Sequence, residues 1–182
     1  MIARAIAALA IASACGRIGF DTSGDGSTFQ YVGFEAESGQ VAPAFEVVAS
    51  GSASGGKYVE DGNLDGYMGS GSLVVTFSVA ASPRPFVIWA RVIAATTGDD
   101  SFEISVDGAS PIPFRTCVNG LSPDWQWVAV TNDCPAGADC CATTNLTYSF
   151  AAGLHVLELT SREGRSIVDR FVVSDDPAYA GG

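Results

Sequence analysis

The sequence predicts an all-β protein, built as an antiparallel β-sandwich. Three observations support this fold class. Short apolar stretches alternate with polar residues at a period of two, as in strands that bury one face. Turn signals rich in Gly, Pro, Asn and Asp separate these stretches at intervals of about 8–15 residues. Beyond the first fifteen residues, no stretch has a convincing helical period. About nine or ten short strands in this rhythm are typical of a sandwich.

The individual strands differ in the pattern that predicts them. Residues 72–79 alternate, with the apolar side chains from Leu73 to Val79 on one face. Residues 85–94 are apolar throughout except for Arg91, which indicates a strand in the middle of a packed sandwich. Residues 101–108 alternate and then turn at an Asp-Gly pair. Further expected strands include 31–37, 125–130, 146–150, 154–161 and 167–174.

Composition limits the classes of function. The chain has 182 residues, of which 47% are hydrophobic and 16% charged, which suits one globular domain and not a disordered chain. Lys and Arg number 9 against 20 Asp and Glu, giving a net charge of −11. Phosphate backbones repel such a chain, so nucleic acid is not an expected partner. Multivalent cations are the more natural partners, although a soluble acidic surface explains the charge equally well.

The N-terminal segment reads as a targeting signal. Residues 1–15 combine a short positive region, an apolar run too short to span a bilayer, and the sequence Ala-Ser-Ala-Cys. This ending resembles a bacterial lipobox, which predicts lipidation of Cys15 and an outer-membrane lipoprotein held to the membrane only by its lipid. Because the usual Leu is missing, an ordinary small-residue cleavage site is the alternative.

The mature chain divides into three parts. Residues 16–30 are rich in Gly, Ser, Thr and Asp and are expected to form a flexible tether. Residues 31–176 are the expected β-sandwich domain, and residues 177–182 a C-terminal tail.

The remaining cysteines predict disulfides, since export implies an oxidising compartment. They are Cys117, Cys134, Cys140 and Cys141. A bond between the two neighbouring cysteines would be strained. That favours Cys117 bonded to either neighbour with Cys134 taking the other, while a Cys117–Cys134 bond would require the neighbours to pair. We interpret residues 132–145 as a surface insertion held by these bonds. A zinc site is the rival interpretation, with His155 as its only nitrogen ligand.

An acidic pair raises the question of a cation. Glu35 and Glu37 lie two residues apart in an expected strand, so both carboxylates should point to one face, roughly 7 Å apart. Like charges on one face repel, and no basic residue lies nearby in the sequence to offset them.

Several segments in order resemble the carbohydrate-binding modules of families 6 and 35, which are galactose-binding-like β-sandwiches. The resemblance covers about residues 31–175, and no single motif carries it. The segments are FEAE, ASGGKYVEDG (53–62), WARV (89–92), SFEISVDG (101–108), DWQWV, FAAGLHVLEL (150–159) and GRSIVDRFVV (164–173). The resemblance implies a jelly-roll sandwich, a structural calcium ion and, in many members, a glycan site.

The resemblance also implies which residues hold the calcium ion. Glu35, Glu37, Asp169 and the main-chain oxygen of Lys57 match the ligand positions. Calcium takes six to eight oxygen ligands from carboxylates and carbonyls, and Gly55-Gly56 would let the backbone bend toward the ion. The ion would tie the first strand to the last and cancel the repulsion between the glutamates. The alternative is a solvated acidic strand, with Asp169 paired to an arginine, either Arg170 or Arg162.

The implied glycan site needs flat aromatic rings flanked by polar side chains. Tyr58 or Tyr67 matches the first ring and Trp125 the second, while Trp127 and Trp89 are expected in the core.

The sequence departs from the family pattern at one position, because no Asn precedes Asp169. Arg165, which stands in the same loop with Arg162 and Glu163, could instead bind a uronic acid or another anionic group. The plainer reading is that these arginines are merely solvated.

No catalytic motif is present, and His155 lies within an expected strand. We therefore expect no enzyme. We expect a monomeric, calcium-stabilised lipoprotein domain that binds polysaccharide at the cell envelope. A structural or adhesion domain that keeps the sandwich but has no sugar site is the second hypothesis.

Overall fold

Alternating burial along paired strands divides the chain into two sheets that share a core. The computed structural model describes residues 17–22, 28–64, 69–131, 140 and 144–181. Within these ranges the strands form two antiparallel sheets, and buried side chains from both meet between them. The predicted all-β antiparallel sandwich is therefore confirmed.

The larger sheet is organised around its last strand. Its members are β1 (Arg17–Thr22), β2 (Thr28–Glu35), β4 (Phe45–Ala49), β5 (Lys57–Asp61), β7 (Val87–Ala94), β10 (Ser122–Ala129) and β12 (Ile167–Ser174). Along one edge, β12 pairs first with β5 and then with β2, and along the other edge it pairs with β7. The sheet continues outward through β1, β4 and β10.

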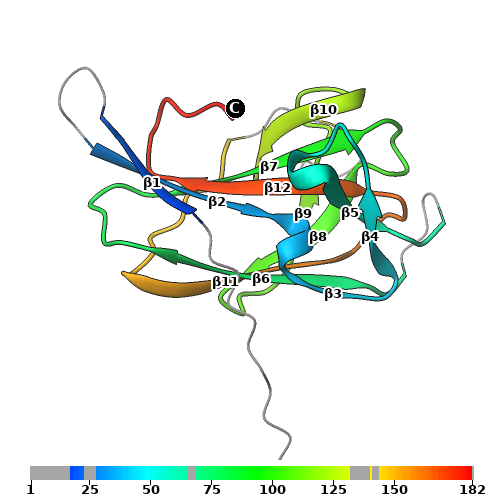
Figure 1. Cartoon of the computed structure of the whole chain (residues 1–182), viewed down its shortest axis with the longest axis horizontal. Helices are drawn as coiled ribbons and strands as arrows, with labels where there is room; N and C mark the ends of the chain where they lie inside the picture. Colours follow the sequence, from blue (N-terminus) through cyan, green and yellow to red (C-terminus); the bar gives the residue numbers. More distant parts are fainter. Residues whose placement is uncertain (1–16, 23–27, 65–68, 132–139, 141–143, 182) are drawn as a thin grey trace, which may run out of the picture.

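The smaller sheet covers the inner face of the larger one. In spatial order its strands are β3 (Gln40–Ala42), β6 (Ser72–Val79), β11 (Gly153–Ser161), β8 (Ser101–Val106) and β9 (Ile112–Arg115). Figure 1 shows β12 and β2 in the upper layer above β6 and β11 in the lower layer. Two short 3-10 segments interrupt the strands, η1 (Ala36–Ser38) and η2 (Ser54–Gly56). None of the helices among the described residues is both long and apolar enough to cross a bilayer.

Aromatic stacking joins the two layers at the centre of the core. β6 buries every second residue, as its sequence predicts. Its Phe77 stacks on Phe34 of β2 at 5.6 Å between ring centroids, and Phe34 stacks in turn on Phe171 of β12 at 5.4 Å. The neighbouring strands β2 and β12 of the larger sheet therefore share one aromatic cluster with β6 of the smaller sheet.

The strand expected at 85–94 is confirmed as β7, between β10 and β12, but only one of its faces is fully buried. In β7 buried residues such as Ile88 and Ala90 alternate with half-buried ones such as Trp89 and Arg91. The physical reason is that the smaller sheet covers only the inner face of the larger one. The outer face is covered in part by loops, so apolar and charged residues can both occupy it.

Two boundary expectations also differ from the structure. Residues 17–22 form β1 and pair with β2, so the flexible tether expected over 16–30 is wrong for these residues. Residues 146–150 are not a strand, and only a single bridge joins Tyr148 to Phe86. Residues 1–16, with Cys15, lie outside the described residues.

The C-terminal segment crosses the outer face of the larger sheet. Tyr179 packs between Tyr31 and Trp89, at 5.4 and 5.8 Å between ring centroids. A Cβ added to Gly181 would lie 2.2 Å from Cβ of Trp127, so the chain end lies directly against that indole.

The Asp-Gly turn after β8 is confirmed, and its carboxylate reaches a neighbouring strand. Asp107 and Gly108 both have positive φ angles, 53° and 72°. Asp107 accepts hydrogen bonds from the backbone N–H of Val156 at 2.9 Å and from Nδ1 of His155 at 2.7 Å. The other ring nitrogen of His155 lies 2.9 Å from the carbonyl oxygen of Ala151. His155 is buried and held on both sides, as a packed histidine would be.

These contacts give a pH-dependent prediction. Burial raises the pKa of Asp107, but the hydrogen bonds from Val156 and His155 and the charge of His155 outweigh it, so the pKa is lowered from 3.8. A lowered pKa stabilises the fold above the unfolded value, and this stability is lost as the pH falls through the folded value. Asp107→Asn keeps a residue that tolerates positive φ, and should lower the melting temperature near neutral pH.

The difference from the wild type should shrink below about pH 3.8, which thermal melts across the acid range would measure. Asp124→Asn, at an exposed position of β10, is the matched control and should show no such difference. A deficit in Asp107→Asn that persists unchanged at low pH would contradict the account.

Candidate functional site

A break in the pairing of β12 positions the acidic residues of the site. β2 runs along β12 only as far as Glu35, and β5 takes the same edge from residue 60 to residue 59. Asp169 lies between these paired stretches, where the register between β12 and β7 shifts. Such a bulge re-aims a side chain. Asp169 is 0% exposed, and its carboxylate accepts from the backbone of η2 in the gap between β2 and β5.

Glu37 does not lie on the strand, contrary to the expectation from the sequence. β2 ends at Glu35 and residues 36–38 form η1, because the chain leaves the larger sheet here to pair as β3 in the smaller one. The two carboxylates nevertheless converge on one point. A Cβ added to Gly55 would lie 3.0 Å from Oε1 of Glu37 and 3.6 Å from Cγ of Glu35.

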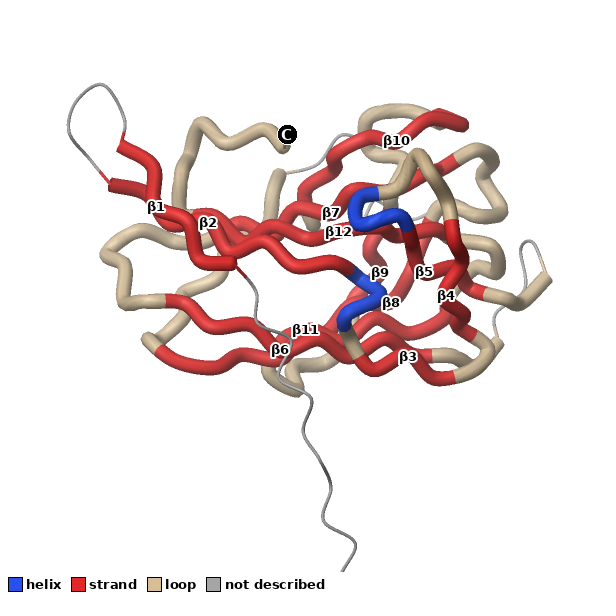
Figure 2. The backbone as a smooth tube through the Cα atoms, viewed as in Figure 1, coloured by secondary structure: helices blue, strands red, loops and turns tan. Residues whose placement is uncertain are grey.

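Gly55 lets η2 close over the carboxylates. Its φ angle of 64° lies in the left-handed region, which a residue with a side chain adopts at a cost. Figure 2 shows η1 and η2 close together at the end of the sandwich near β4 and β5. The backbone bend predicted at Gly55-Gly56 is therefore present, and it brings the 50–56 loop onto the acidic residues.

Each of the three carboxylates keeps one buried oxygen to which no described residue hydrogen-bonds. These oxygens are Oε2 of Glu35, Oε2 of Glu37 and Oδ1 of Asp169. Ser54 donates hydrogen bonds to the other oxygen of two of these carboxylates. Its backbone N–H donates to Oδ2 of Asp169 at 3.2 Å and its hydroxyl donates to Oε1 of Glu35 at 3.0 Å. Unpaired buried acceptors are costly, which makes these three oxygens suited to a cation.

The electrostatics of Glu37 agree with this picture. Burial is the largest effect and raises its pKa. A backbone hydrogen bond lowers that pKa, the nearby charges of Glu35 and Asp169 raise it, and the charge of Lys57 lowers it slightly. The negative charges of Glu35 and Asp169 therefore act on Glu37, as expected where three carboxylates gather. Lys57 directly follows η2 and its side chain is exposed. Its main-chain oxygen as a ligand stays a prediction.

Two arginines contact the acidic cluster from the outer face of the sheet. Arg91 of β7 donates through Nη1 to Oδ2 of Asp169, and Nε of Arg170 lies 3.6 Å from Oε1 of Glu35. The expected pairing of Asp169 with Arg170 or Arg162 is therefore wrong. Arg162 instead forms ion pairs with two glutamates, Glu103 at 3.6 Å and Glu163 at 3.1 Å.

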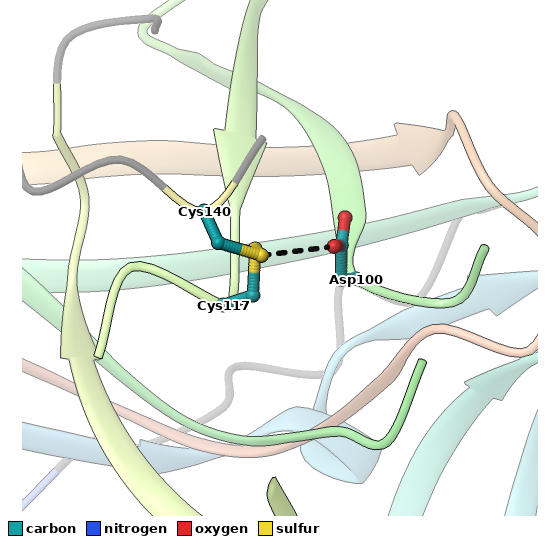
Figure 3. A group of neighbouring side chains, drawn as sticks. All are labelled: Asp100, Cys117 and Cys140. Atoms are coloured by element: carbon teal, nitrogen blue, oxygen red, sulfur yellow. Dashed lines mark hydrogen bonds between the residues drawn. A yellow bond between two sulfur atoms is a disulfide. The ribbon is translucent and has the colours of Figure 1, made fainter. Parts of the chain in front are cut away.

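The carboxylates fit a hard divalent cation in chemistry but lie more open than in a loaded site. Ligands on opposite sides of calcium are separated by about 4.8 Å, twice the usual bond length. In the described part of the chain, only Asp100, Cys117 and Cys140 gather ligand atoms within 4.8 Å of one another. Figure 3 shows that the sulfurs of this group form a disulfide, so they offer no thiolate to zinc. Residues 35, 37 and 169 would have to draw closer around an ion.

The Cys117–Cys140 disulfide confirms one of the two pairings that the sequence favoured for Cys117. The other expected disulfide residues, Cys134 and Cys141, lie outside the described residues.

Two aromatic residues of the expected glycan site are brought together. Tyr58 of β5 and Trp125 of β10 meet edge to face, with ring centroids 5.7 Å apart and an interplanar angle of 68°. Both are half-buried. The guanidinium of Arg91 lies 4.8 Å from the ring centroid of Trp125, and the indole N–H donates to Oγ of Ser52 at 3.2 Å. Tyr67 lies outside the described residues.

Arg165 is exposed at the margin of this aromatic pair. It occupies a turn with a φ angle of 65°, and its backbone N–H donates to the carbonyl of Asp61 at 2.7 Å. Its charge lowers the pKa of Glu60, although burial dominates and raises that pKa overall. Glu60 in turn accepts from the hydroxyl of Tyr58 at 3.4 Å. Arg165 is thus connected to the aromatic pair through Glu60.

The expectation that Trp89 and Trp127 belong to the core is wrong. Both are half-buried on the outer face of the larger sheet, where Trp127 is the register partner of Arg91. Sequence reasoning also missed Arg91 as a site residue. The sequence did contain a signal, because Arg91 is a charged residue within an apolar strand. That signal indicates a site only once the strand is known to have one face that the other sheet does not cover.

A polar hollow of about 340 Å³ opens beside the acidic cluster. Its lining residues are Ser52, Ala53, Ser54, Arg91, Trp127 and Arg170. The hollow, the aromatic pair and the acidic cluster therefore share Arg91 and the 50–56 loop.

Solved structures with the same fold include carbohydrate-binding modules and glycan-degrading enzymes. The family 35 carbohydrate-binding module from Clostridium thermocellum matches with a TM-score of 0.52 and 18% identity, covering 79% of this chain and 96% of the module. The C-terminal CBM6 of a marine laminarinase from Zobellia galactanivorans matches with a TM-score of 0.54 and 15% identity, covering 79% and 98%.

A larger enzyme also contains this fold. The GH26-CBM35 β-(1,4)-mannanase of Podospora anserina matches with a TM-score of 0.58 and 16% identity, covering 82% of this chain but only 28% of the enzyme. No protein-family model matches the chain, and no curated protein matches it. At these identities the likeness shows the fold alone, which is that of a carbohydrate-binding-module-like domain.

Proposed function

We propose that this chain is a non-catalytic carbohydrate-binding domain, monomeric and stabilised by calcium. The observation that carries the proposal is the convergence of Tyr58 and Trp125 on the outer face of the larger sheet, beside the acidic cluster. Pyranose rings stack their apolar faces on aromatic side chains, and neighbouring polar groups bind their hydroxyls. Ser52, Glu60 and Arg165 stand close enough to the pair to supply such groups.

The geometry favours an L-shaped platform over two parallel walls. Because Tyr58 and Trp125 touch edge to face, a sugar cannot lie between their rings as they stand. It can lie on one ring face while the edge of the other ring contacts its rim. The polysaccharide would then run across the outer surface, with one sugar unit fixed at the platform.

Calcium is the cation that best suits the acidic cluster. Its ligands would be Glu35, Glu37 and Asp169, with the main-chain oxygen of Lys57, in an all-oxygen site that tolerates irregular geometry. The site would be structural, joining the end of β2 to the bulge of β12. The buried oxygens that lack partners support this proposal.

The second candidate is a structural or adhesion domain without a sugar site. One observation favours it, because fully buried Val168 stands directly before Asp169, where the family resemblance implies an Asn that grips sugar hydroxyls.

Chelation tests the calcium proposal. Calcium chloride added to EDTA-stripped protein should raise the melting temperature by about 5–10 °C, because a ligand at 100 times its dissociation constant contributes about 2.7 kcal/mol. Glu37→Gln should melt at or above the wild type in EDTA, since it removes like charge, and should lose most of the calcium shift.

Glu158→Gln on β11 is the matched control for this experiment and should keep the full shift. Identical melting curves with and without calcium would sink the calcium site.

Glycan binding tests the platform. Trp125→Ala in the soluble domain should weaken the affinity for a bound polysaccharide at least tenfold, or about 1.4 kcal/mol, on a glycan array followed by calorimetry. Trp89→Ala removes another half-buried indole of the same sheet face, next to the C-terminal segment, and should bind normally. Undiminished binding by Trp125→Ala would show that Trp125 is not part of the sugar site. A failure to bind any glycan would favour the structural or adhesion domain.

Lipid anchoring at Cys15 in the outer membrane remains part of the proposal for the whole protein. Several acyl chains hold a domain on a membrane, at roughly 0.8 kcal/mol per buried CH₂. The full chain should therefore sediment with membranes, and Cys15→Ser should release it or block its processing. Membrane association unchanged by Cys15→Ser, with no lipid mass on the mature N-terminus, would contradict lipidation.

A further inference from the structure

The polar hollow is formed by a row of side chains across three neighbouring strands. Arg170 of β12 is the register partner of Arg91 of β7, and Arg91 is the register partner of Trp127 of β10. Side chains directly opposite on one face have Cβ atoms about 4.5–5.5 Å apart. Two guanidinium groups so placed repel each other unless an anion lies between or beside them.

The two arginines use only some of their N–H donors in hydrogen bonds to described residues. Arg91 donates through Nη1 to Asp169 and through Nη2, weakly at 3.4 Å, to the carbonyl of Ser52. Nε of Arg170 is buried without a hydrogen-bond partner in the described chain, and its ion pair with Glu35 spans 3.6 Å. A guanidinium carries five N–H donors in a planar fork that matches the oxygens of carboxylates and sulfates.

Gly33 keeps the second guanidinium in the hollow. A Cβ added to Gly33 would lie 2.8 Å from Nη2 of Arg170, so the guanidinium occupies the space that a side chain on this residue of β2 would fill. The position of this charge therefore depends on a residue without a side chain.

The balance of charge around the hollow depends on the cation site. Three carboxylates face two guanidiniums, so the cluster carries excess negative charge, which exposed Lys57 offsets only in part because solvent screens it. A divalent cation on the inward oxygens reverses the sign. It binds other oxygens of Asp169 and Glu35 than the arginines do, but its charge weakens the attraction between these acids and the two guanidiniums. More of the arginine donors are then available to a ligand.

We propose that this hollow binds an oxyanion, a carboxylate or sulfate group, through Arg91 and Arg170, and that a divalent cation on Glu35, Glu37 and Asp169 strengthens that binding. The inference rests on the proposed cation site and extends the proposed function. The oxyanion is either free or carried by a sugar stacked at Trp125, whose ring contacts Arg91.

Linkage requires the effect to be mutual. If calcium tightens oxyanion binding by some factor, the oxyanion tightens calcium binding by the same factor, and coupling between two sites commonly amounts to about 5- to 150-fold. Both sites must therefore be titrated.

Calorimetry on the soluble domain tests the proposal with three probes at constant ionic strength. Sodium sulfate represents a free oxyanion, methyl glucuronoside a sugar-borne carboxylate, and methyl glucoside its neutral match. Each probe is titrated in EDTA and in excess calcium chloride. Sulfate or the glucuronoside should bind at least about fivefold more tightly with calcium, while the glucoside shows no such gain. Coupling seen only with the glucuronoside assigns the group to a sugar, and coupling seen with sulfate shows that the oxyanion suffices.

Variants separate the hollow from the rest of the surface. Arg170→Gln should abolish oxyanion binding, and Gly33→Ala should weaken it by displacing the guanidinium while its charge is kept. Arg84→Gln is the matched control, because Arg84 lies elsewhere over Phe29 and pairs with Asp175. Melting curves with and without calcium establish that each variant folds and retains its cation site.

The outcomes distinguish a failure of the oxyanion site from a failure of the cation site. A calcium-induced melting shift without any oxyanion binding overturns the hollow and leaves the proposed cation site standing. Oxyanion binding of equal affinity in EDTA and calcium overturns the coupling, and equal binding by Arg170→Gln overturns the assigned residues. The absence of any calcium shift overturns the cation site and the coupling together.

Discussion

The buried carboxylate of Asp169 is the constraint on which the rest of this surface depends. Burying a charge without partners costs several kcal/mol, so the fold must surround it with compensating groups. The bulge in β12 that turns Asp169 into the gap between β2 and β5 also determines which groups can reach it. They come from η2, from the neighbouring strand β7 and, through the acidic cluster, from the end of β2. Distant parts of the chain are therefore organised around one side chain.

The two oxygens of the Asp169 carboxylate have different partners. One oxygen accepts from Arg91 and from the backbone of Ser54, which covers the outer side. The other is buried and has no hydrogen-bond partner among the described residues. Arginine alone cannot neutralise such a cluster, because its guanidinium approaches from one side. A small cation that takes oxygens from several directions can, which is why we favour two kinds of positive charge acting on the same acids.

The sequence predicted the sandwich well because strand periodicity is local. The alternation in residues 72–79 and the turn at Asp107-Gly108 need no knowledge of the rest of the chain. Glu37 was predicted less well, since only the crossing from one sheet to the other explains why β2 ends before it. The sequence could not predict that Trp89 and Arg91 lie on the outer face, because the apolar pattern of residues 85–94 is compatible with a strand buried on one face or on both. Which face stays open is decided by the other sheet, and no local pattern records it.

The aromatic platform and the acidic cluster are consequently one structure and not two neighbouring sites. Arg91 donates to Asp169 with one nitrogen and its guanidinium lies over the ring of Trp125, so a change in the charge around Asp169 alters the cation–π contact with that indole. The 50–56 loop links them again, because Ser54 binds the carboxylates and Ser52 receives the indole N–H. A cation that fixes this loop would reduce the conformational entropy lost when a sugar binds. An ion that does not itself contact the sugar would in this way raise the affinity for it.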